Sequence, residues 1–174
     1  MTENRCTHQP TLQTVRLRLK PRTLDDLEAC LEMDRDPAVT RYVPGPWNEP
    51  AEHRAFVMAR MRLPVEPMWG YWSVFAHDSD TFLGWVFLLP AQGDTPDLDA
   101  EIGWRFVQQA WGQGLATEAA AAVMSHGHAS GVRRIHAEIL RGNTGSVRVA
   151  SKLGMRAQRS LDSEHGPVDV YVGA

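Results

Sequence analysis

A glycine-bearing segment between an apolar run and a small-residue helix has the composition of a phosphate-binding turn. The apolar run covers residues 102–107, and the segment reads Gln109-Ala-Trp-Gly-Gln-Gly-Leu-Ala-Thr117. Leu115, Ala119 and Val123 then recur at helical spacing. The first backbone N–H groups of such a helix lack intrahelical partners and carry partial positive charge, and glycines remove the Cβ atoms that would keep a ligand away. The sequence therefore predicts a strand, a turn and a helix that together bind a phosphate or pyrophosphate.

Two common phosphate-binding motifs do not fit this turn. A Walker-type loop needs a lysine followed by serine or threonine after its last glycine, and Leu115 and Ala116 stand there instead. A dinucleotide fingerprint needs a third small residue three places after Gly114, where Thr117 stands, and an acidic residue that closes a second strand. A phosphate ligand would therefore be a different compound, and an ordinary strand-to-helix turn remains the alternative, because glycine is common in turns.

A second polar pair stands at the start of another expected helix, residues 143–153. Asn143 occupies a capping position at the junction with the preceding strand, and Ser146 follows three residues later, so both lie on one helix face. These residues suit plain capping equally well. Gly154 is expected to end the helix in a left-handed conformation.

Three titratable residues are candidates for proton transfer. Glu101, at the head of the apolar run, is the first choice as a general base, directly or through a water. Asp99 is the second choice, because it lies two residues earlier on the same strand face. His136, on the expected strand 133–140, is the third.

Composition restricts the function further. The formal charge of −3 and pI near 6.1 argue against general nucleic-acid binding. No apolar run is long enough to cross a bilayer, and the N-terminus lacks a signal-peptide pattern. Cys6 and Cys30 are too few for a disulfide framework, so we expect a cytoplasmic protein. His126 and His128 face different sides of a helix, so we expect no metal site.

The remaining elements follow from local patterns. We expect residues 1–10 to be a flexible tail and residues 11–174 to form one α/β domain. Strands are expected over 15–20, 69–75, 82–89, 155–159 and 168–172, and helices from Thr23 to Asp36 and over 49–61. The basic residues Arg16, Arg18 and Lys20 are expected on a solvated face.

The glycine turn and the Asn143 segment together resemble the GNAT acyltransferases. That family has the turn pattern Gln/Arg-x-x-Gly-x-Gly/Ala, which Gln109, Gly112 and Gly114 match. It also has Asn-x-x-Ala/Ser followed by Lys-Leu-Gly-Phe, to which Asn143, Ser146 and Lys152-Leu-Gly-Met are similar. The resemblance implies a GNAT fold: a mixed, mostly antiparallel sheet of about seven strands with helices on both faces. The strands at 102–107 and 133–140 are then expected to splay apart and admit the pantetheine arm of acetyl-CoA.

The resemblance also implies the site. The general base would be Glu101, and Ser146 would assist the departing thiolate, since the tyrosine that many GNAT enzymes carry seven residues after the asparagine is Ala150 here. The expected acetyl-CoA contacts are Phe106, Val107, Gln109, Gly112, Gln113, Gly114, Leu115, Ala116, Thr117, Asn143, Ser146 and Lys152.

Further segments look like the RimJ/RimL branch, whose members acetylate the N-terminal amines of ribosomal proteins. They are Thr14 to Leu19, Asp36-Pro37 with Arg41 to Val43, residues 101–104 and residues 111–119. The resemblance implies an acetyl-CoA-dependent N-acetyltransferase, monomeric or homodimeric, that acts on a protein N-terminus. A small amine acceptor and a non-catalytic acyl-CoA-binding domain remain open. Trp47, in a Pro-Gly-Pro setting, is the tryptophan most expected to touch the acceptor, and Trp111 is expected to brace the turn.

Overall fold

One eight-stranded sheet carries the helices of the protein, in the strand order β1-β2-β3-β4-β5-β6-β8-β7. The computed structural model describes residues 9–64, 66–92 and 97–173. The strands are β1 (Leu12–Gln13), β2 (Leu17–Pro21), β3 (Gly70–Ala76), β4 (Phe82–Pro90), β5 (Ala100–Phe106), β6 (Ile135–Leu140), β7 (Arg156–Ser163) and β8 (Gly166–Gly173). The helices are η1 (Leu24–Asp26), α1 (Leu27–Asp34), α2 (Pro37–Thr40), α3 (Pro50–Met61), η2 (Gln108–Ala110), α4 (Leu115–Ala129) and α5 (Thr144–Lys152).

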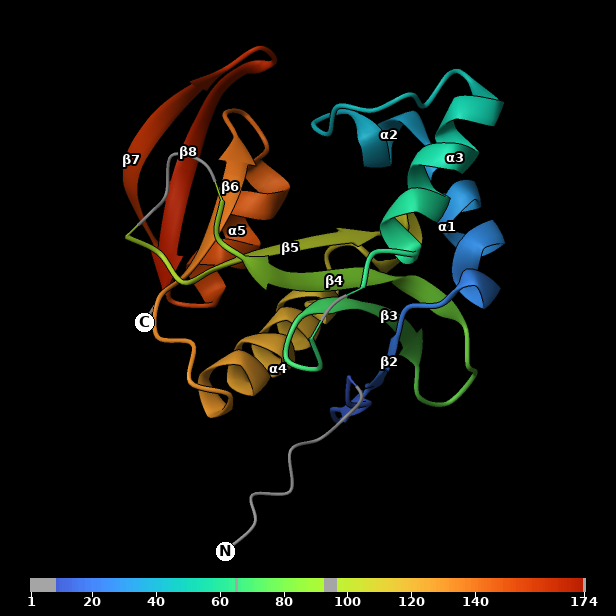
Figure 1. Ribbon diagram of the computed structural model, residues 1–174, viewed down its shortest axis with the longest axis horizontal. Coiled ribbons are helices and arrows are strands. Elements are labelled where there is room, and N and C mark those ends of the chain that lie inside the picture. The colour runs from blue at the N-terminus through green and yellow to red at the C-terminus, as the bar shows by residue number, and fades with distance from the viewer. Residues whose placement is uncertain (1–8, 65, 93–96, 174) are drawn as a thin grey trace, which may run out of the picture.

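The sheet divides into two halves between β5 and β6. Neighbouring strands pair antiparallel everywhere except at β5 and β6, which run parallel and share only the register pairs Ala100–Ile135 and Glu101–His136. Beyond these pairs the two strands diverge, and Figure 1 shows β6, β7 and β8 turning away from β5. The expected splay is therefore present.

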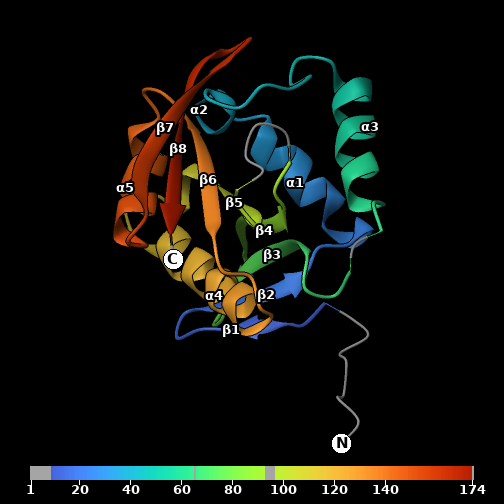
Figure 2. The same cartoon turned by 60° about the vertical axis from the view of Figure 1, so that its left-hand side comes forward.

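The two faces of the first half-sheet carry different helices. Ala119, Ala120 and Val123 of α4 are completely buried against one face, as the helical spacing predicted. On the opposite face, α1 and α3 form a second apolar cluster with Trp85 of β4. Figure 2 shows α4 and the pair α1 and α3 on the two sides of the sheet. The predicted α/β architecture, with a mixed, mostly antiparallel sheet and helices on both faces, is confirmed.

The first strand and first helix differ from their predicted bounds. The strand expected over 15–20 begins only at Leu17, after a bend at Val15 and Arg16, and the unexpected short strand β1 precedes that bend, so the sheet has eight strands rather than about seven. The expected helix from Thr23 begins as η1, capped by Thr23 as predicted, and α1 ends at Asp34. Asp36 then caps the short helix α2 through a bond from the Ala38 N–H, because proline begins the new helix better than it continues the old one.

The predicted tail, residues 1–10, lies mostly outside the described residues. At its end, Gln9 Nε2 donates to the Tyr71 carbonyl oxygen at 3.0 Å, and the Pro10 carbonyl oxygen accepts from Trp72 Nε1 at 2.8 Å. These bonds attach the start of the described chain to β3.

Candidate active site

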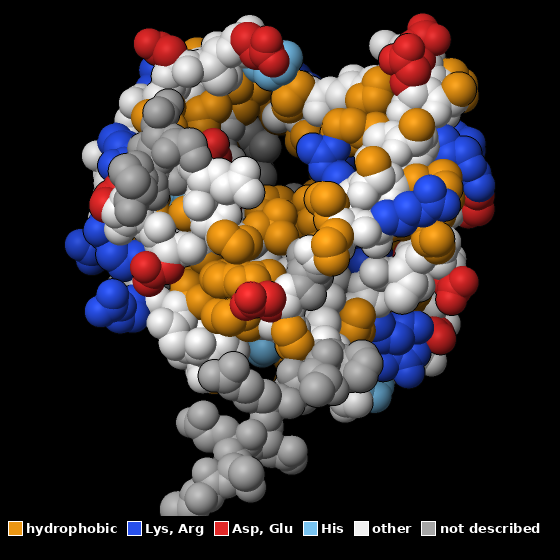
Figure 3. Space-filling view, in the orientation of Figure 1, with side chains coloured by type: hydrophobic (Ala, Val, Ile, Leu, Met, Phe, Trp, Pro, Cys, Tyr) orange, Lys and Arg blue, Asp and Glu red, His pale blue; other side chains and the backbone are white. Residues whose placement is uncertain are grey.

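A cleft of about 1140 Å³ passes through the sheet where β5 and β6 separate. From the α4 side it is lined by the turn at Gly112–Thr117 and by α5, and from the opposite face by side chains of β3, β4 and β5. Figure 3 shows this hollow between the two upper lobes of the molecule, with an apolar floor and a basic side chain on one wall. Two ligands that enter from opposite faces can therefore meet inside the sheet.

The glycine turn presents bare main chain to the cleft. Gly112 and Gly114 have φ angles of 74° and 77°, which side chains rarely tolerate. A Cβ atom on Gly112 would meet nothing within 4 Å, and one on Gly114 only Arg16 Nη2 at 3.7 Å. No side chain caps α4, so the N–H groups of its first turn are open to an anionic ligand. Trp111, as expected, braces the turn by donating from Nε1 to the Phe106 carbonyl oxygen at 2.9 Å.

Arg16 fixes the turn from outside the cleft and is exposed, as expected. Its Nη1 donates to the Gln113 carbonyl oxygen at 3.0 Å, and its Nε donates to Glu118 Oε2 at 2.7 Å. Thr14 Oγ1 and the Arg16 backbone N–H donate to the other carboxylate oxygen of Glu118. The bend between β1 and β2 therefore holds both sides of the glycine turn.

The start of α5 forms the opposite wall. Asn143 Oδ1 accepts from the Ser146 backbone N–H at 3.2 Å, which is the predicted helix cap. Asn143, Ser146 and Lys152 line the cleft. Ala150, which replaces the expected tyrosine, is completely buried, so this position faces the core rather than the cleft.

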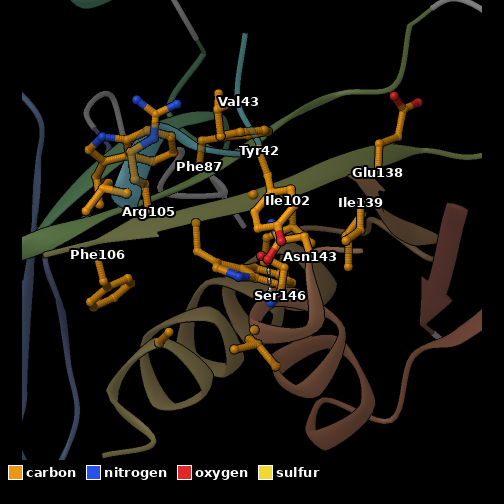
Figure 4. Close-up of a pocket in the computed structure, with 18 of the residues that line it drawn as sticks. Tyr42, Val43, Phe87, Ile102, Arg105, Phe106, Glu138, Ile139, Asn143 and Ser146 are labelled. Atoms are coloured by element: carbon orange, nitrogen blue, oxygen red, sulfur yellow. Dashed lines mark hydrogen bonds between the residues drawn. The ribbon is translucent and has the colours of Figure 1, made fainter. Parts of the chain in front are cut away.

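Tyr42 faces α5 from across the cleft. The loop after α2 carries it, and its ring lies 3.9 Å from where a Cβ atom of Gly142 would be. In Figure 4 the Tyr42 side chain points toward Asn143 and Ser146. Sequence reasoning missed this phenol, because 100 residues of chain separate it from Gly142.

Glu101 occupies the last paired position before the strands separate. It is partly buried and lines the cleft, and its register partner is His136. Burial raises the pKa of the Glu101 carboxyl to about 7, with the nearby Glu138 carboxylate adding to the rise and His136 opposing it. A carboxyl group with this pKa exchanges its proton near neutral pH, which is what a general base requires.

The other two proton-transfer candidates have structural partners. Asp99 Oδ2 accepts the backbone N–H groups of Arg133 and Arg134 at 2.8 and 2.9 Å, and these bonds lower the pKa of Asp99. His136 is 1% exposed and its Nδ1 bonds the Ala100 carbonyl oxygen at 2.8 Å. Neither residue lines the cleft.

The backbone of β5 supplies a hydrogen-bond donor to the gap. The Val107 N–H donates to the Leu83 carbonyl oxygen, and the Ala91 N–H donates to the Asp99 carbonyl oxygen. In an antiparallel pair every second residue is hydrogen-bonded to the neighbouring strand, so the odd-numbered residues of β5 are the ones bonded to β4. The main-chain N–H of Trp104 therefore turns away from β4, toward the side where pairing with β6 has ended. This donor faces the gap beside the cleft.

The opposite face of the sheet is aromatic. Gly103 allows the Phe87 ring to lie across β5, since a Cβ atom there would stand 2.3 Å from Phe87 Cε1. Tyr71 and Trp85 continue the same wall, with ring centroids 5.5 Å apart. Trp47, expected at the acceptor, is not among the cleft-lining residues; its Nε1 donates to the Val43 carbonyl oxygen at 2.7 Å.

Most of the expected acetyl-CoA contacts gather around one cleft. The cleft is lined by Phe106, Gly112, Gly114, Leu115, Ala116, Thr117, Asn143, Ser146 and Lys152. Gln109 and Gln113 lie instead at a smaller hollow on the outer side of the turn, near Arg16, and Val107 packs in the core. Among the described residues, no helix could span a membrane and no group of three or more His, Cys, Asp or Glu side chains is arranged to hold a metal ion.

Comparisons with known proteins match this geometry. Residues 16–156 match the family described as "Acetyltransferase (GNAT) domain". The chain is 27% identical over 168 residues to the uncharacterised N-acetyltransferase p20 of Bacillus licheniformis, with 93% of each chain covered. An acetyltransferase of the GNAT family from Bacillus anthracis has a similar structure, with a TM-score of 0.76 and 26% identity over 94% of this chain and 96% of that one.

The fold is also similar to RimL, the ribosomal L7/L12 alpha-N-protein acetyltransferase, solved in complex with coenzyme A. The TM-score is 0.78 with 16% identity, over 94% of this chain and 97% of RimL. The family match, the splayed strands and the glycine turn agree: the chain belongs to the GNAT family and is an N-acetyltransferase.

Proposed function

We propose that this enzyme transfers an acetyl group from acetyl-CoA to the N-terminal α-amine of a protein or peptide. The observation that carries the proposal is the cleft through the sheet, with the Glu101 carboxyl at the crossing. The fold similarity to RimL supports the peptide acceptor, because RimL is named as an alpha-N-protein acetyltransferase.

The residues of the cleft fit acetyl-CoA. The open main chain at Gly112 and Gly114 and the uncapped start of α4 suit a pyrophosphate, and the Lys152 ammonium suits a phosphate. Asn143 and Ser146 line the cleft and would flank the pantetheine arm. When bound, acetyl-CoA supplies an activated thioester.

Glu101 prepares the acceptor amine. An α-amino group has a pKa of ~8 and is mostly protonated at neutral pH, so it must lose a proton before it can attack. Glu101, whose pKa is about 7, accepts this proton directly or through a water. The Trp104 N–H, which faces the gap, is suited to stabilise negative charge on a carbonyl oxygen there.

The proton for the departing thiolate comes from a hydroxyl group on the wall of the cleft. A thiol has a pKa of ~8.5, so a modest donor is sufficient. Ser146 is our first choice because it lines the cleft beside the cap at Asn143. Tyr42, which points at the same residues, is the second.

A small amine is the second candidate acceptor. The aromatic rings of Tyr71, Trp85 and Phe87 on the acceptor face would suit a compact molecule as well as the first residues of a peptide. We set aside a non-catalytic acyl-CoA-binding role, because Glu101 and Ser146 are both in place in the cleft.

The test is release of free thiol from acetyl-CoA in the presence of peptides and small amines. Mass spectrometry then locates the acetyl group on each product. We expect α-N-acetylated peptides. Acetylation confined to small amines would replace the peptide with the second candidate, and thiol release with none of the acceptors would overturn the proposed function.

A further inference from the structure

The guanidinium of Arg22 lies in the cleft without a counter-ion. Its Cζ is 3.7 Å from the centroid of the Tyr71 ring and 5.6 Å from that of Trp85. Its Nε and Nη2 atoms are buried and have no hydrogen-bond partner, and no carboxylate of the described residues forms an ion pair with it. A buried charge without a partner is costly, so such a group is normally paired.

The charges around Arg22 do not balance. The buried carboxylate of Asp34 accepts from Arg105 Nη1 at 2.6 Å and lies 3.3 Å from His53 Nε2, so it is engaged by other groups. Cys30 supplies no negative charge, because burial raises the pKa of its thiol to about 12. Two guanidinium groups therefore share one carboxylate. The Arg105 Cζ lies 4.9 Å from the same Trp85 ring, which places both cations around one indole.

This excess charge lies on the acceptor side of the sheet. The Arg22 N–H donates to the Tyr71 carbonyl oxygen, Tyr71 pairs with Phe87, and Phe87 pairs with Gly103, so the four residues form one row across the strands. Strands lie ~4.8 Å apart, so the row is roughly 14 Å long. Glu101 stands two residues from Gly103 on the same face, and the cofactor turn is on the opposite face. A ligand that reached from Glu101 to Arg22 would lie along the aromatic wall.

We propose that Arg22 binds a carboxylate of the acceptor, several bonds away from the amine that Glu101 deprotonates. This inference rests on the proposed acetyl transfer and names the acceptor class: an amine that also carries an acid, either as an acidic side chain near a peptide N-terminus or as a small amino acid with a distant carboxylate. The carboxylate would supply the negative charge that Arg22 lacks and would accept a charge-assisted hydrogen bond from its guanidinium.

The test uses acceptor pairs that differ only in the acid. In the peptide arm, tetrapeptide amides begin Ser-Asp or Ser-Asn. In the small-molecule arm, straight-chain ω-amino acids of increasing length are compared with their carboxamides. We expect the better arm to show a preference for the acid of roughly 10- to 100-fold in kcat/KM, as for a buried charge-assisted pair. Equal use of the two members, or a preference for the amide, would overturn the proposal.

The variants Arg22→Gln and Arg22→Lys assign the preference to this side chain. Arg22→Gln should reduce the acid-to-amide ratio to about one, and Arg22→Lys should retain part of it because the charge remains. Arg54→Gln is the matched control: Arg54 is exposed on α3, pairs with Glu28 at 2.6 Å and does not line the cleft, so its loss should leave the ratio unchanged. An acid preference that survives in Arg22→Gln would contradict the assignment.

Binding without turnover separates this inference from the proposed function. Thermal unfolding of the wild-type protein and of Arg22→Gln is followed with the acid and the amide at equal concentrations. We expect the acid to raise the Tm of the wild-type protein more than the amide does, and this difference to vanish in Arg22→Gln. If no acceptor is acetylated but the Arg22-dependent stabilisation persists, the proposed function fails and the anion subsite stands. If acceptors are acetylated but the acid stabilises the wild-type protein and Arg22→Gln equally, the proposed function stands and the anion subsite at Arg22 is wrong.

Discussion

Arg16 and Glu118 join the bend between β1 and β2 to the first turn of α4. Arg16 Nε and Nη2 each lie 2.7 Å from Glu118 Oε2, and the pair is partly exposed. The same guanidinium holds the Gln113 carbonyl oxygen, so it restrains the glycine turn without entering the cleft.

Arg16→Met should therefore weaken acetyl-CoA binding and spare the chemical step. Partly exposed ion pairs contribute about 0.2–1 kcal/mol, which corresponds to roughly a 1.4- to fivefold rise in the KM for acetyl-CoA. Arg18→Met is the control, because Arg18 pairs with the exposed Asp80 away from the turn. Steady-state kinetics with varied acetyl-CoA measure both variants. A fall in kcat at an unchanged KM would contradict a restraining role.

Glu101→Gln should lower kcat/KM for the acceptor by a factor of about 10² to 10⁴, the usual contribution of a general base. In the wild-type enzyme the rate should rise with pH through about 7, because the carboxyl must be ionised to accept a proton. The variant should lose this limb of the pH–rate profile. Glu164→Gln, in an exposed turn, provides the control, and an unaltered limb in Glu101→Gln would assign it to another group.

Glu138→Gln should move that limb to lower pH. The Glu138 carboxylate helps to raise the pKa of Glu101, so its removal makes Glu101 easier to ionise. The plateau rate should remain similar, because Glu101 itself is retained. The measurement is the pH–rate profile of kcat/KM from pH 5 to 9. A shift to higher pH would show that Glu138 acts by something other than repulsion.

Ser146→Ala should lower kcat by a factor of about 10² if its hydroxyl donates to the departing thiolate, at the low end of general-acid contributions. The control is Thr144→Ala, which removes a hydroxyl from the same turn of α5. Tyr42→Phe is measured beside it. A normal rate in Ser146→Ala together with a slow Tyr42→Phe would transfer the donor role to Tyr42.

Glu101→Gln should also stabilise the fold in a pH-dependent manner. The pKa of Glu101 is raised on folding, so between about 4.5 and 7 the native state binds more protons than the unfolded chain, and its stability falls as pH rises. The amide removes this loss. Relative to the wild-type protein, the variant should gain stability through this window, on the order of 3 kcal/mol by pH 8. Denaturant unfolding at pH 4.5 and 8 measures the difference, and an equal gain at both pH values would contradict the linkage.

Local patterns were sufficient for the helices that carry the site. Thr23, Asn143 and Gly154 act as the predicted caps, and Leu115, Ala119 and Val123 form the predicted buried stripe, because capping and periodicity depend on residues close in sequence. The splay between β5 and β6 came only from the family resemblance. Nothing in the composition of either strand indicates where their pairing ends.

The residues that sequence reasoning missed act across long separations. Arg16 reaches Glu118 over 102 positions, and Arg105 reaches Asp34 over 71. Arginine side chains are normally solvated, so neither Arg16 in the expected strand nor Arg22 after it carried a signal of its contacts. A glycine inside a strand is expected to weaken it, but the missing side chain of Gly103 leaves the space that the Phe87 ring occupies.

The divergence of β5 and β6 also bears on solubility. An open strand edge is usually a hazard, because its free main-chain groups invite a strand of another molecule and begin aggregation. Here the diverging edges of β5 and β6 face one another inside the protein, where a neighbouring chain would have to thread between two lobes to reach them. The fold thus keeps main-chain groups available to a ligand while leaving no open edge along which another chain could add a strand.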